Sequence, residues 1–354
     1  MAIISDDEGL EKRVKKNPII KPETIEYDNT FENSIRPKDF DSYIGQGALK
    51  ETLKITLEAA KKRGKPLDHL LFYGPPGLGK TTIAGVIASQ MGVEIRITSA
   101  PALERPRDII GILMSLKGGE ILFIDEIHRL NKVAEEILYP AMEDFTLDMT
   151  TGKSQTAKTL RVPLPKFTLI GATTKAGELS SPLRDRFGMI HRLEFYTVEE
   201  LAQVVMRTAK ILETEITEEG AKAIAMRSRG TPRIANRLVK RVSDFALVKY
   251  DGIIDKKVAN ESLDILKIDE FGLDNTDRNL LNLIIEKYDG GPVGIETIAA
   301  ALSEDVRTIE DVCEPYLLQA GLLQRTPRGR KVSPEGYRHL GIKMPSEQRR
   351  LFED

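Results

Sequence analysis

Cysteine, long apolar runs and an excess of either charge are all scarce in this 354-residue sequence. The single cysteine, Cys313, excludes an internal disulfide and is typical of a protein in a reducing cytosol. There is no run of eighteen apolar residues, and the N-terminus lacks the apolar core of a signal peptide, so we expect a cytoplasmic protein with no membrane partner. The net charge of −2 excludes a chain that is basic throughout, so any contact with nucleic acid must come from a local patch.

A glycine-rich loop is the most informative stretch that is present. It reads Gly74-Pro75-Pro76-Gly77-Leu78-Gly79-Lys80-Thr81-Thr82, between a run at 69–73 that predicts a buried strand and a stretch at 82–91 that predicts a helix. Gly77 and Gly79 let backbone N–H groups approach phosphate oxygens with no side chain in the way. We expect Lys80 to reach the β- and γ-phosphates of ATP, Thr81 to hold Mg²⁺, and Thr82 to complete the nucleotide site at the helix N-terminus. The alternative is a plain glycine-rich turn before a helix, which the intact motif disfavours.

Two acidic residues follow the next predicted strand. The apolar run at 121–124 ends in Asp125 and Glu126, at the carboxyl edge of a parallel sheet, where the glycine loop also lies. Asp125 can hold Mg²⁺ through water, and Glu126 can polarise the water that attacks ATP. Two acids after a strand can also be a helix cap or a loop. The phosphate loop, with Lys80 45 residues before Asp125, favours the catalytic interpretation.

A third predicted strand, at 167–172, ends in Thr173 and Thr174. Their hydroxyls suit a group that orients water or contacts the γ-phosphate, although a simple loop cap is the alternative. Between these strands, apolar and polar residues alternate on both sides of Gly152-Lys153-Ser154-Gln155, which predicts a β-hairpin at about 147–164. This hairpin is either an exposed docking arm or an edge hairpin that covers the core.

Helical spacing dominates at 39–63 and again from 197 to about 267, where it predicts a small bundle. Thr197 and Glu200 form a capping box, and Thr231-Pro232 is a cap followed by proline at the first helical position. Arg233 then lies in the first helical turn, where a cation opposes the helix dipole, and this conflict indicates a function. Arg186 lies in a loop, where it is either solvated or salt-bridged, or else inserted into the nucleotide site of a neighbouring subunit.

From about 270 the pattern predicts helices at 277–288, 295–302 and 306–319, the last interrupted near Pro315, and then a hairpin. Three helices followed by a basic hairpin are the outline of a winged helix. The hairpin contains four cations, Arg325, Arg328, Arg330 and Lys331. A solvated turn is one interpretation, and the helices before it favour contact with DNA phosphates instead.

Taken together, these motifs resemble AAA+ ATPases and, among them, the RuvB family, whose members drive branch migration of Holliday junctions. The resemblance covers the chain from about Ile35 to the end of the wing. It is carried by Gly74 to Thr82, Asp125-Glu126-Ile127-His128-Arg129-Leu130, Gly171-Ala172-Thr173-Thr174, Arg229-Gly230-Thr231-Pro232-Arg233, Glu314-Pro315-Tyr316-Leu317-Leu318-Gln319-Ala320-Gly321 and Arg325-Thr326-Pro327-Arg328-Gly329-Arg330. The last two stretches are specific to that family.

The resemblance implies an α/β AAA+ ATPase core with a parallel sheet and a phosphate loop, an all-helical lid domain and a C-terminal winged-helix domain. We place a flexible arm at 1–30, the large ATPase domain at 31–196, the lid at 197–268 and the winged-helix domain at 269–354. The implied partners are the duplex arms of Holliday-junction DNA, further copies of the chain in a homo-hexamer, the protein RuvA through the hairpin, and the junction resolvase RuvC.

The resemblance also implies roles for individual residues, with ATP, ADP and Mg²⁺ as the bound groups. Thr174 matches the first sensor, and Arg186 matches the arginine finger that acts on the ATP of the neighbouring subunit. Arg325 and Arg330 match wing residues that contact DNA, beside Arg328. The remaining residues fall where the family binds the nucleotide, with Arg233 as the second sensor: Ile35, Arg36, Glu143, Asp144, Phe145, Tyr196 and Arg233.

Two other functions are open at this stage. A clamp loader or replication initiator would share the ATPase motifs, although the basic winged helix directly after the lid argues against a clamp loader. An ATP-gated DNA-binding regulator would bind nucleotide without moving along DNA. The presence of both Lys80 and Glu126 disfavours a regulator, because a pure binder does not need an acid that aligns water.

Overall fold

A five-stranded parallel sheet forms the centre of the first domain. The computed structural model describes residues 34–151 and 158–345. The strands lie in the order β2 (Ile95–Ser99), β3 (Ile121–Asp125), β6 (Thr168–Thr173), β1 (Leu70–Tyr73) and β7 (Met189–Arg192). All four pairings are parallel, with Phe123 opposite Ile170 and Ile170 opposite Leu70. The three strands that the sequence predicts are confirmed to within one residue at each end, whereas β2 and β7, the two edge strands, were not predicted.

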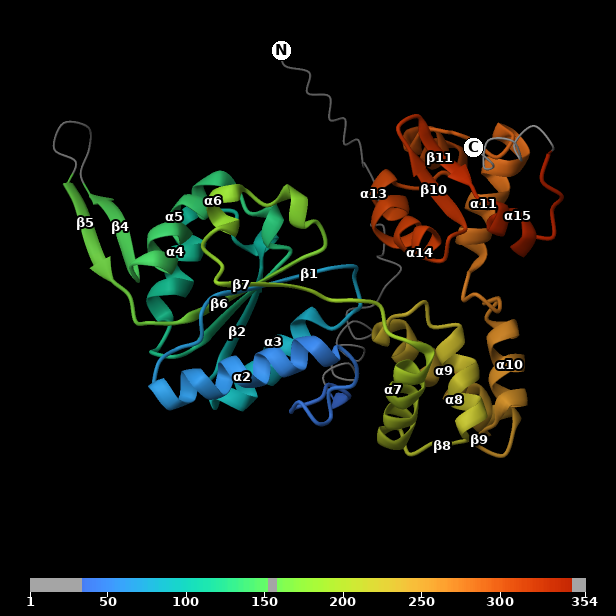
Figure 1. Ribbon diagram of the computed structural model, residues 1–354, viewed down its shortest axis with the longest axis horizontal. Helices are drawn as coiled ribbons and strands as arrows, with labels where there is room; N and C mark the ends of the chain where they lie inside the picture. Colours follow the sequence, from blue (N-terminus) through green and yellow to red (C-terminus); the bar gives the residue numbers. More distant parts are fainter. Residues whose placement is uncertain (1–33, 152–157, 346–354) are drawn as a thin grey trace, which may run out of the picture. The chain divides into compact units, whose positions relative to one another are not determined.

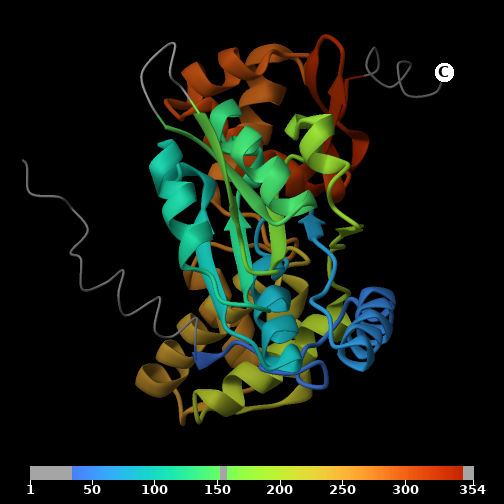
Figure 2. The ribbon, with the colours of Figure 1, turned by 90° about the vertical axis from the view of Figure 1, so that its left-hand side faces the viewer.

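Helices cover both faces of this sheet (Figures 1 and 2). Successive side chains of a strand point to opposite faces, so Leu70 and Phe72 pack with α2 and α3, whereas Leu71 packs with α4 and α5. Burial on both faces explains why the central strands are continuous apolar runs. The helices are α2 (Gly47–Arg63), α3 (Lys80–Met91), α4 (Pro106–Ser115), α5 (Lys132–Glu143) and the short α6 (Ser181–Arg184).

Two predicted helix starts differ from the structure. The helix predicted over 39–63 begins only at Gly47, because Gly45 and Gln46 have left-handed backbone angles with φ of 77° and 53°. Before that turn, Asp39 accepts a hydrogen bond from the Ser42 backbone N–H at 2.7 Å in a local turn. The helix after the glycine loop begins at Lys80 rather than Thr82, so the loop ends directly at the helix N-terminus.

The hairpin consists of β4 (Thr146–Thr151) and β5 (Lys158–Pro163), which pair antiparallel with each other and with no strand of the central sheet in the described residues. Its base is anchored, because Leu147 and Leu164 are buried in the core. Further out, Leu160 is 56% exposed. The predicted turn at Gly152 to Gln155 lies outside the described residues. The hairpin therefore does not serve as an edge of the central sheet, and its two strands project away from that sheet (Figure 1).

The next domain contains the helices α7 (Val198–Ile211), α8 (Glu218–Met226), α9 (Pro232–Lys249) and α10 (Lys256–Ile265). A two-residue parallel pairing of β8 (Glu215–Ile216) with β9 (Ile253–Ile254) ties their connections together. The capping box of Thr197 and Glu200 is confirmed, with hydrogen bonds of 2.9 and 3.2 Å. Thr231 precedes the proline as predicted, but its hydroxyl donates to the Ser228 carbonyl at 3.4 Å and does not cap α9.

The last domain has the winged-helix arrangement that the sequence predicts. Its elements are α11 (Asn275–Tyr288), α12 (Ile295–Leu302), α13 (Val306–Thr308), a π-helical turn (Ile309–Cys313), α14 (Glu314–Gln319), β10 (Leu323–Thr326), β11 (Gly329–Val332) and α15 (Pro334–His339). The interruption near Pro315 is this π-helical turn, which accommodates a residue that has no backbone N–H to donate. Cys313 is buried in the core of this domain.

Close backbone contact fixes the wing to the rest of the domain. Val293 and Arg330 exchange backbone hydrogen bonds of 2.9 and 2.8 Å. Gly329 has a φ of 135°, and a Cβ there would lie 2.3 Å from the Val293 carbonyl oxygen, so only glycine fits. In none of the three domains, over the described residues, is a helix both long and apolar enough to cross a bilayer.

Candidate functional site

The glycine loop connects β1 to α3 and has the shape of a phosphate cradle. Gly77 and Gly79 have φ of 82° and 95°, which side chains rarely adopt. A Cβ at Gly77 would lie 3.2 Å from Cβ of Arg233, and one at Gly79 would lie 3.2 Å from the Tyr43 hydroxyl. No acidic residue lies in the first turn of α3, so its N-terminal N–H groups and partial positive charge are available to an anion.

Lys80 supplies a buried cation beside this cradle. Its ammonium donates to the carbonyl oxygens of Gly74 at 2.7 Å and Pro75 at 2.9 Å. Burial lowers the pKa of Lys80 to about 8, against the opposing effect of the carboxylates of Asp125 and Glu126. The charge of Arg233 lowers the pKa further. Two cations at the same loop disfavour each other, and a bound phosphate would relieve this conflict. The residues therefore fit the triphosphate of a nucleotide.

The residues expected to hold a metal ion also fit. Thr81 lies in the first turn of α3, and Asp125 lies at the carboxyl end of β3. A hydroxyl and a carboxylate are oxygen ligands of the kind that Mg²⁺ prefers, with water and substrate phosphates completing its shell. The backbone N–H of Glu126 donates to Asp125 Oδ1 at 2.9 Å, which fixes that carboxylate at the edge of the sheet.

Glu126 is held by two neighbouring strand ends. Its backbone is left-handed, with a φ of 49°, and its Oε2 accepts a hydrogen bond from the Thr174 hydroxyl at 3.2 Å. His128 Nδ1 lies 3.3 Å from the same oxygen and 2.8 Å from the Thr173 hydroxyl. The structure therefore brings together Glu126 and Thr174, as expected, and adds His128. His128 stands in the quoted Asp-Glu-Ile-His motif, but its position in the motif gives no sign of the side-chain contact.

Tyr196, directly before the helices of the second domain, and Arg233 of that domain both reach the phosphate loop. The Tyr196 hydroxyl donates to the Tyr43 hydroxyl at 3.3 Å and lies 3.5 Å from the Leu78 carbonyl oxygen. Burial raises the pKa of Tyr196 to about 12, so it stays protonated. The Arg233 backbone N–H donates to the Gly77 carbonyl at 3.4 Å. Tyr43, which also faces Gly79, was missed because its segment was predicted to be helical.

A second group of predicted residues lies elsewhere. Phe145 packs against His69 and Phe167, with ring centroids 6.1 and 5.9 Å apart. His69 and Phe167 directly precede β1 and β6, at the amino edge of the sheet, whereas the phosphate loop follows the carboxyl end of β1. Glu143, at the end of α5, belongs to the same region as Phe145, as does Asp144 between them. The structure thus does not bring 143–145 to the phosphate loop of the same chain.

Glu143 instead lies beside Arg186. The Arg186 guanidinium donates to Glu143 at 2.9 Å and to the Pro182 carbonyl at 2.7 Å, and it lies 4.6 Å from the centre of the Tyr139 ring. Met142, Glu143, Asp185 and Arg186 line one concave surface. Arg186 and Glu143 therefore form one face, separate from the loop. Ile35 is buried and Arg36 half-buried, and both belong to a unit of their own at the start of the chain.

The wing arginines divide into two kinds. The Arg325 side chain is 62% exposed, and Arg328 at the turn is exposed as well. The Arg330 side chain is only 10% exposed and forms a two-pronged ion pair with the buried Glu314 of α14, at 3.1 and 3.0 Å. Arg330 therefore fastens β11 to α14, and its expected contact with DNA stays a prediction. Arg325 and Arg328 remain at the surface.

Comparisons with known proteins agree over the whole chain. Three family models match in succession: the Holliday junction DNA helicase RuvB P-loop domain at 35–193, the RuvB AAA lid domain at 196–269, and the RuvB C-terminal winged helix domain at 270–341. The Holliday junction branch migration complex subunit RuvB of Crocosphaera subtropica is 59% identical over 354 residues, with 100% of both chains covered. The same subunit of a Nostoc species is 58% identical over 340 residues, which are 96% of this chain and 93% of the relative.

Solved structures give the same result. The Thermotoga maritima RuvB Holliday junction branch migration motor is 50% identical, with a TM-score of 0.80 over 88% of this chain and 100% of that chain. A variant of the same Thermotoga maritima protein has a TM-score of 0.82, with 88% of this chain and 99% of that chain covered.

Proposed function

The chain belongs to the RuvB family, and from this premise we propose how its residues use ATP to move DNA. As a member of this family it is an ATP-dependent DNA helicase that drives branch migration of Holliday junctions. The observation that carries the residue assignment is the meeting of Lys80, Glu126 and Arg233 at one phosphate loop. A cradle of N–H groups, a buried cation, a carboxylate and a second cation from another domain are what ATP hydrolysis with a domain movement requires.

The phosphate loop and Lys80 hold the β- and γ-phosphates, and Thr81 and Asp125 hold the magnesium ion. Bound there, Mg²⁺ would neutralise phosphate charge. Thr82, one residue further along α3, completes the nucleotide site. Glu126 orients the attacking water and accepts its proton, with Thr174 and His128 setting the direction of the carboxylate.

The second face, with Arg186 and residues 143–145, completes the nucleotide site of a neighbouring copy of the chain. In a ring, each copy presents its phosphate loop to the Arg186 face of the next, and we propose a hexamer. Arg186 then stabilises the negative charge that develops in the transition state, and a lone subunit lacks this contribution. This assignment is supported by the position of Arg186 beside Glu143, near the amino ends of the strands. The phosphate loop of the same chain follows the carboxyl end of β1, out of reach of Arg186.

Contact with DNA comes from the wing. We propose that Arg325 and Arg328 bind phosphates of a duplex arm and do not read bases, because a motor has to pass over every sequence. The hairpin of β4 and β5 docks on RuvA, supported by its exposed Leu160 and its anchored base. RuvC is a further proposed partner of the assembly. We also propose that the protein works in the cytoplasm, where bacterial DNA lies.

Strand displacement from a synthetic four-way junction, with RuvA of a close relative present, tests the proposal. The wild-type chain should convert the junction to duplex products with ATP, and Glu126→Gln should bind nucleotide normally yet give no products. ATPase activity that is stimulated by duplex DNA, without any conversion of the junction to duplex products, would instead favour a DNA-binding regulator.

A further inference from the structure

One turn of the chain connects the phosphate loop to the winged-helix domain. The turn, Arg229 to Arg233, enters α9 through two left-handed residues, Arg229 with a φ of 51° and Gly230 with 66°. At its end, the Arg233 backbone N–H donates to the Gly77 carbonyl of the loop. At its beginning, the Arg229 side chain points the other way, into the winged-helix domain. The two arginines are four residues apart, so a displacement of one must displace the other.

Arg229 makes a dense set of contacts, here called the joint. Its Nε donates to the Gly272 carbonyl at 2.6 Å, and its Nη2 pairs with the carboxylates of Asp277 and, at 3.2 Å, Asp274. The guanidinium lies 5.6 Å from the centre of the Tyr316 ring on α14. The side chain is 11% exposed, and that of Asp277 is fully buried. A planar guanidinium with fixed donors, buried between two carboxylates, holds its partners in one orientation.

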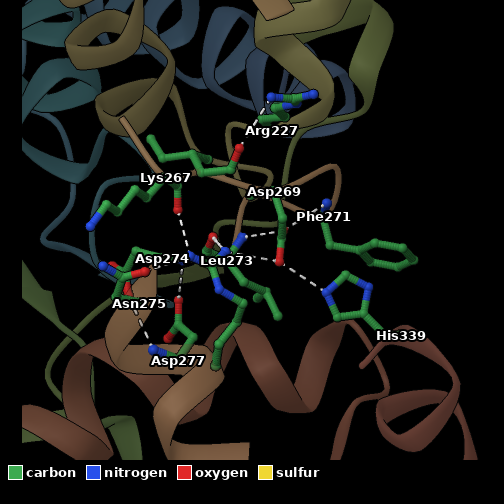
Figure 3. A network of polar contacts seen from close by, with 12 residues as sticks. Arg227, Lys267, Asp269, Phe271, Leu273, Asp274, Asn275, Asp277 and His339 are labelled. Atoms are coloured by element: carbon green, nitrogen blue, oxygen red, sulfur yellow. Dashed lines mark hydrogen bonds and ion pairs between the residues drawn. The ribbon is translucent and has the colours of Figure 1, made fainter. Parts of the chain in front are cut away.

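The linker after α10 is also fixed, as Figure 3 shows. Asp269 accepts hydrogen bonds from the backbone N–H groups of Phe271 at 3.0 Å and Leu273 at 2.8 Å. The same carboxylate lies 3.3 Å from Arg278 of α11 and 3.0 Å from His339 of α15. The linker is therefore fixed to the winged-helix domain, because its own backbone, α11 and α15 all converge on one carboxylate.

We propose that Arg229 is a positioning residue that makes the lid and the winged-helix domain move as one body. When ATP or its products shift Arg233, the joint carries that shift to the wing, and the step on DNA is coupled to hydrolysis. This inference rests on the proposed function, because it assumes that the wing holds DNA. Among the described residues the side chain of Arg229 contacts the winged-helix domain and not the phosphate loop, so we expect its loss to leave the chemistry of hydrolysis in place.

The test compares Arg229→Ala with wild type and with Arg241→Ala. Arg241 is an exposed arginine of α9, the helix that follows the turn, and it forms a long ion pair of 3.6 Å to Asp244, so it controls for the loss of one positive charge from the lid domain. For each protein, ATP hydrolysis, the salt dependence of duplex binding, thermal stability and the number of base pairs migrated per ATP are measured in the complete assembly with RuvA.

We expect Arg229→Ala to hydrolyse ATP and bind duplex like wild type, while its migration per ATP falls by on the order of tenfold. Arg229→Lys should recover part of the loss, because an ammonium keeps the charge but not the fork. Unchanged migration per ATP in Arg229→Ala would overturn the inference, and so would a loss of hydrolysis equal to the loss of migration.

Asp277→Asn keeps the shape of the joint and serves as a second variant if Arg229→Ala does not fold. It should lower migration per ATP in the same direction and less strongly, and no change in a folded Asp277→Asn protein would again overturn the inference. The control separates the two hypotheses. If wild type and Arg241→Ala also fail to move the junction, the proposed function is wrong, whereas the inference alone fails if every variant moves it with as many base pairs per ATP as wild type.

Discussion

The buried carboxylate of Asp277 gives the winged-helix domain a measurable dependence on pH. Burial raises the pKa of Asp277 from its ordinary 3.8 to about 6, with the charge of Asp274 acting in the same direction and that of Arg229 against it. In the unfolded chain the carboxyl group titrates near 3.8. The folded state therefore binds a proton more tightly than the unfolded state does, and the stability gained by protonation is lost as the pH rises through about 6.

The magnitude follows from these two pKa values. Each pKa unit corresponds to about 1.4 kcal/mol, so the full effect of burying the ionised group is about 3 kcal/mol. Only part of it falls in an accessible range: between pH 7 and pH 5, protonation of Asp277 stabilises the folded state by about 1 kcal/mol. For a domain of this size that corresponds to roughly 5 °C in melting temperature.

Asp277→Asn removes the titration and keeps a side chain that can accept from Arg229. Other groups titrate alike in both proteins, so the difference between them isolates Asp277. Calorimetry on the full chain at pH 5 and pH 7 should show wild type gaining about 1 kcal/mol relative to Asp277→Asn at the lower pH. A difference that is the same at both pH values would mean that the Asp277 carboxylate is not held in a dry site, and the reasoning would be refuted.

Four further substitutions test the nucleotide site and the wing. His128→Ala should lower kcat for ATP hydrolysis by about tenfold with KM for ATP unchanged, because it orients the water-activating carboxylate and touches no phosphate; a change in KM alone contradicts this. Arg186→Ala should lower the ATPase rate of the assembled protein by about 10³ or more; near-normal turnover would exclude a shared site. Arg330→Ala should destabilise the winged-helix domain by about 3 kcal/mol in thermal denaturation, because the buried Glu314 loses its close ion pair and keeps only the 3.9 Å contact with Arg325. Arg325→Ala should instead keep stability and lower the slope of log affinity against log salt by about 0.9; an unchanged slope excludes Arg325 as a phosphate contact.

The parts of the fold that could be predicted from sequence are those set by neighbouring residues. The glycine loop, the acids after β3 and the winged-helix elements each follow from spacing over a few residues. The edge strands β2 and β7 could not be predicted, because an edge strand is only partly covered and its apolar pattern is weak: Ile97 of β2 is 56% exposed. The start of α2 was missed because helical spacing does not register the left-handed Gln46.

Sequence indicates the chemistry of a residue more readily than its surroundings. The wing arginines look alike in the sequence, but Arg330 is buried because Glu314, sixteen residues earlier, meets it in space. Residues 143–145 and Lys80 both match nucleotide-binding positions. Their separation becomes visible only in the fold, where 143–145 lie at the amino ends of the parallel strands and Lys80 follows the carboxyl end of β1. The contacts of Arg229 with Asp277 likewise depend on the packing of two domains, which no local pattern describes.

The buried thiol of Cys313 has a practical use. Burial raises its pKa to about 12, and it is the single cysteine of the chain, so the protein offers almost no thiolate to maleimide reagents at neutral pH. A cysteine introduced on the exposed surface of α10 or α12 would then carry a fluorophore alone, with the native residue left in place. Pairs of such dyes would allow energy transfer between lid and wing to be followed on single molecules while a junction migrates.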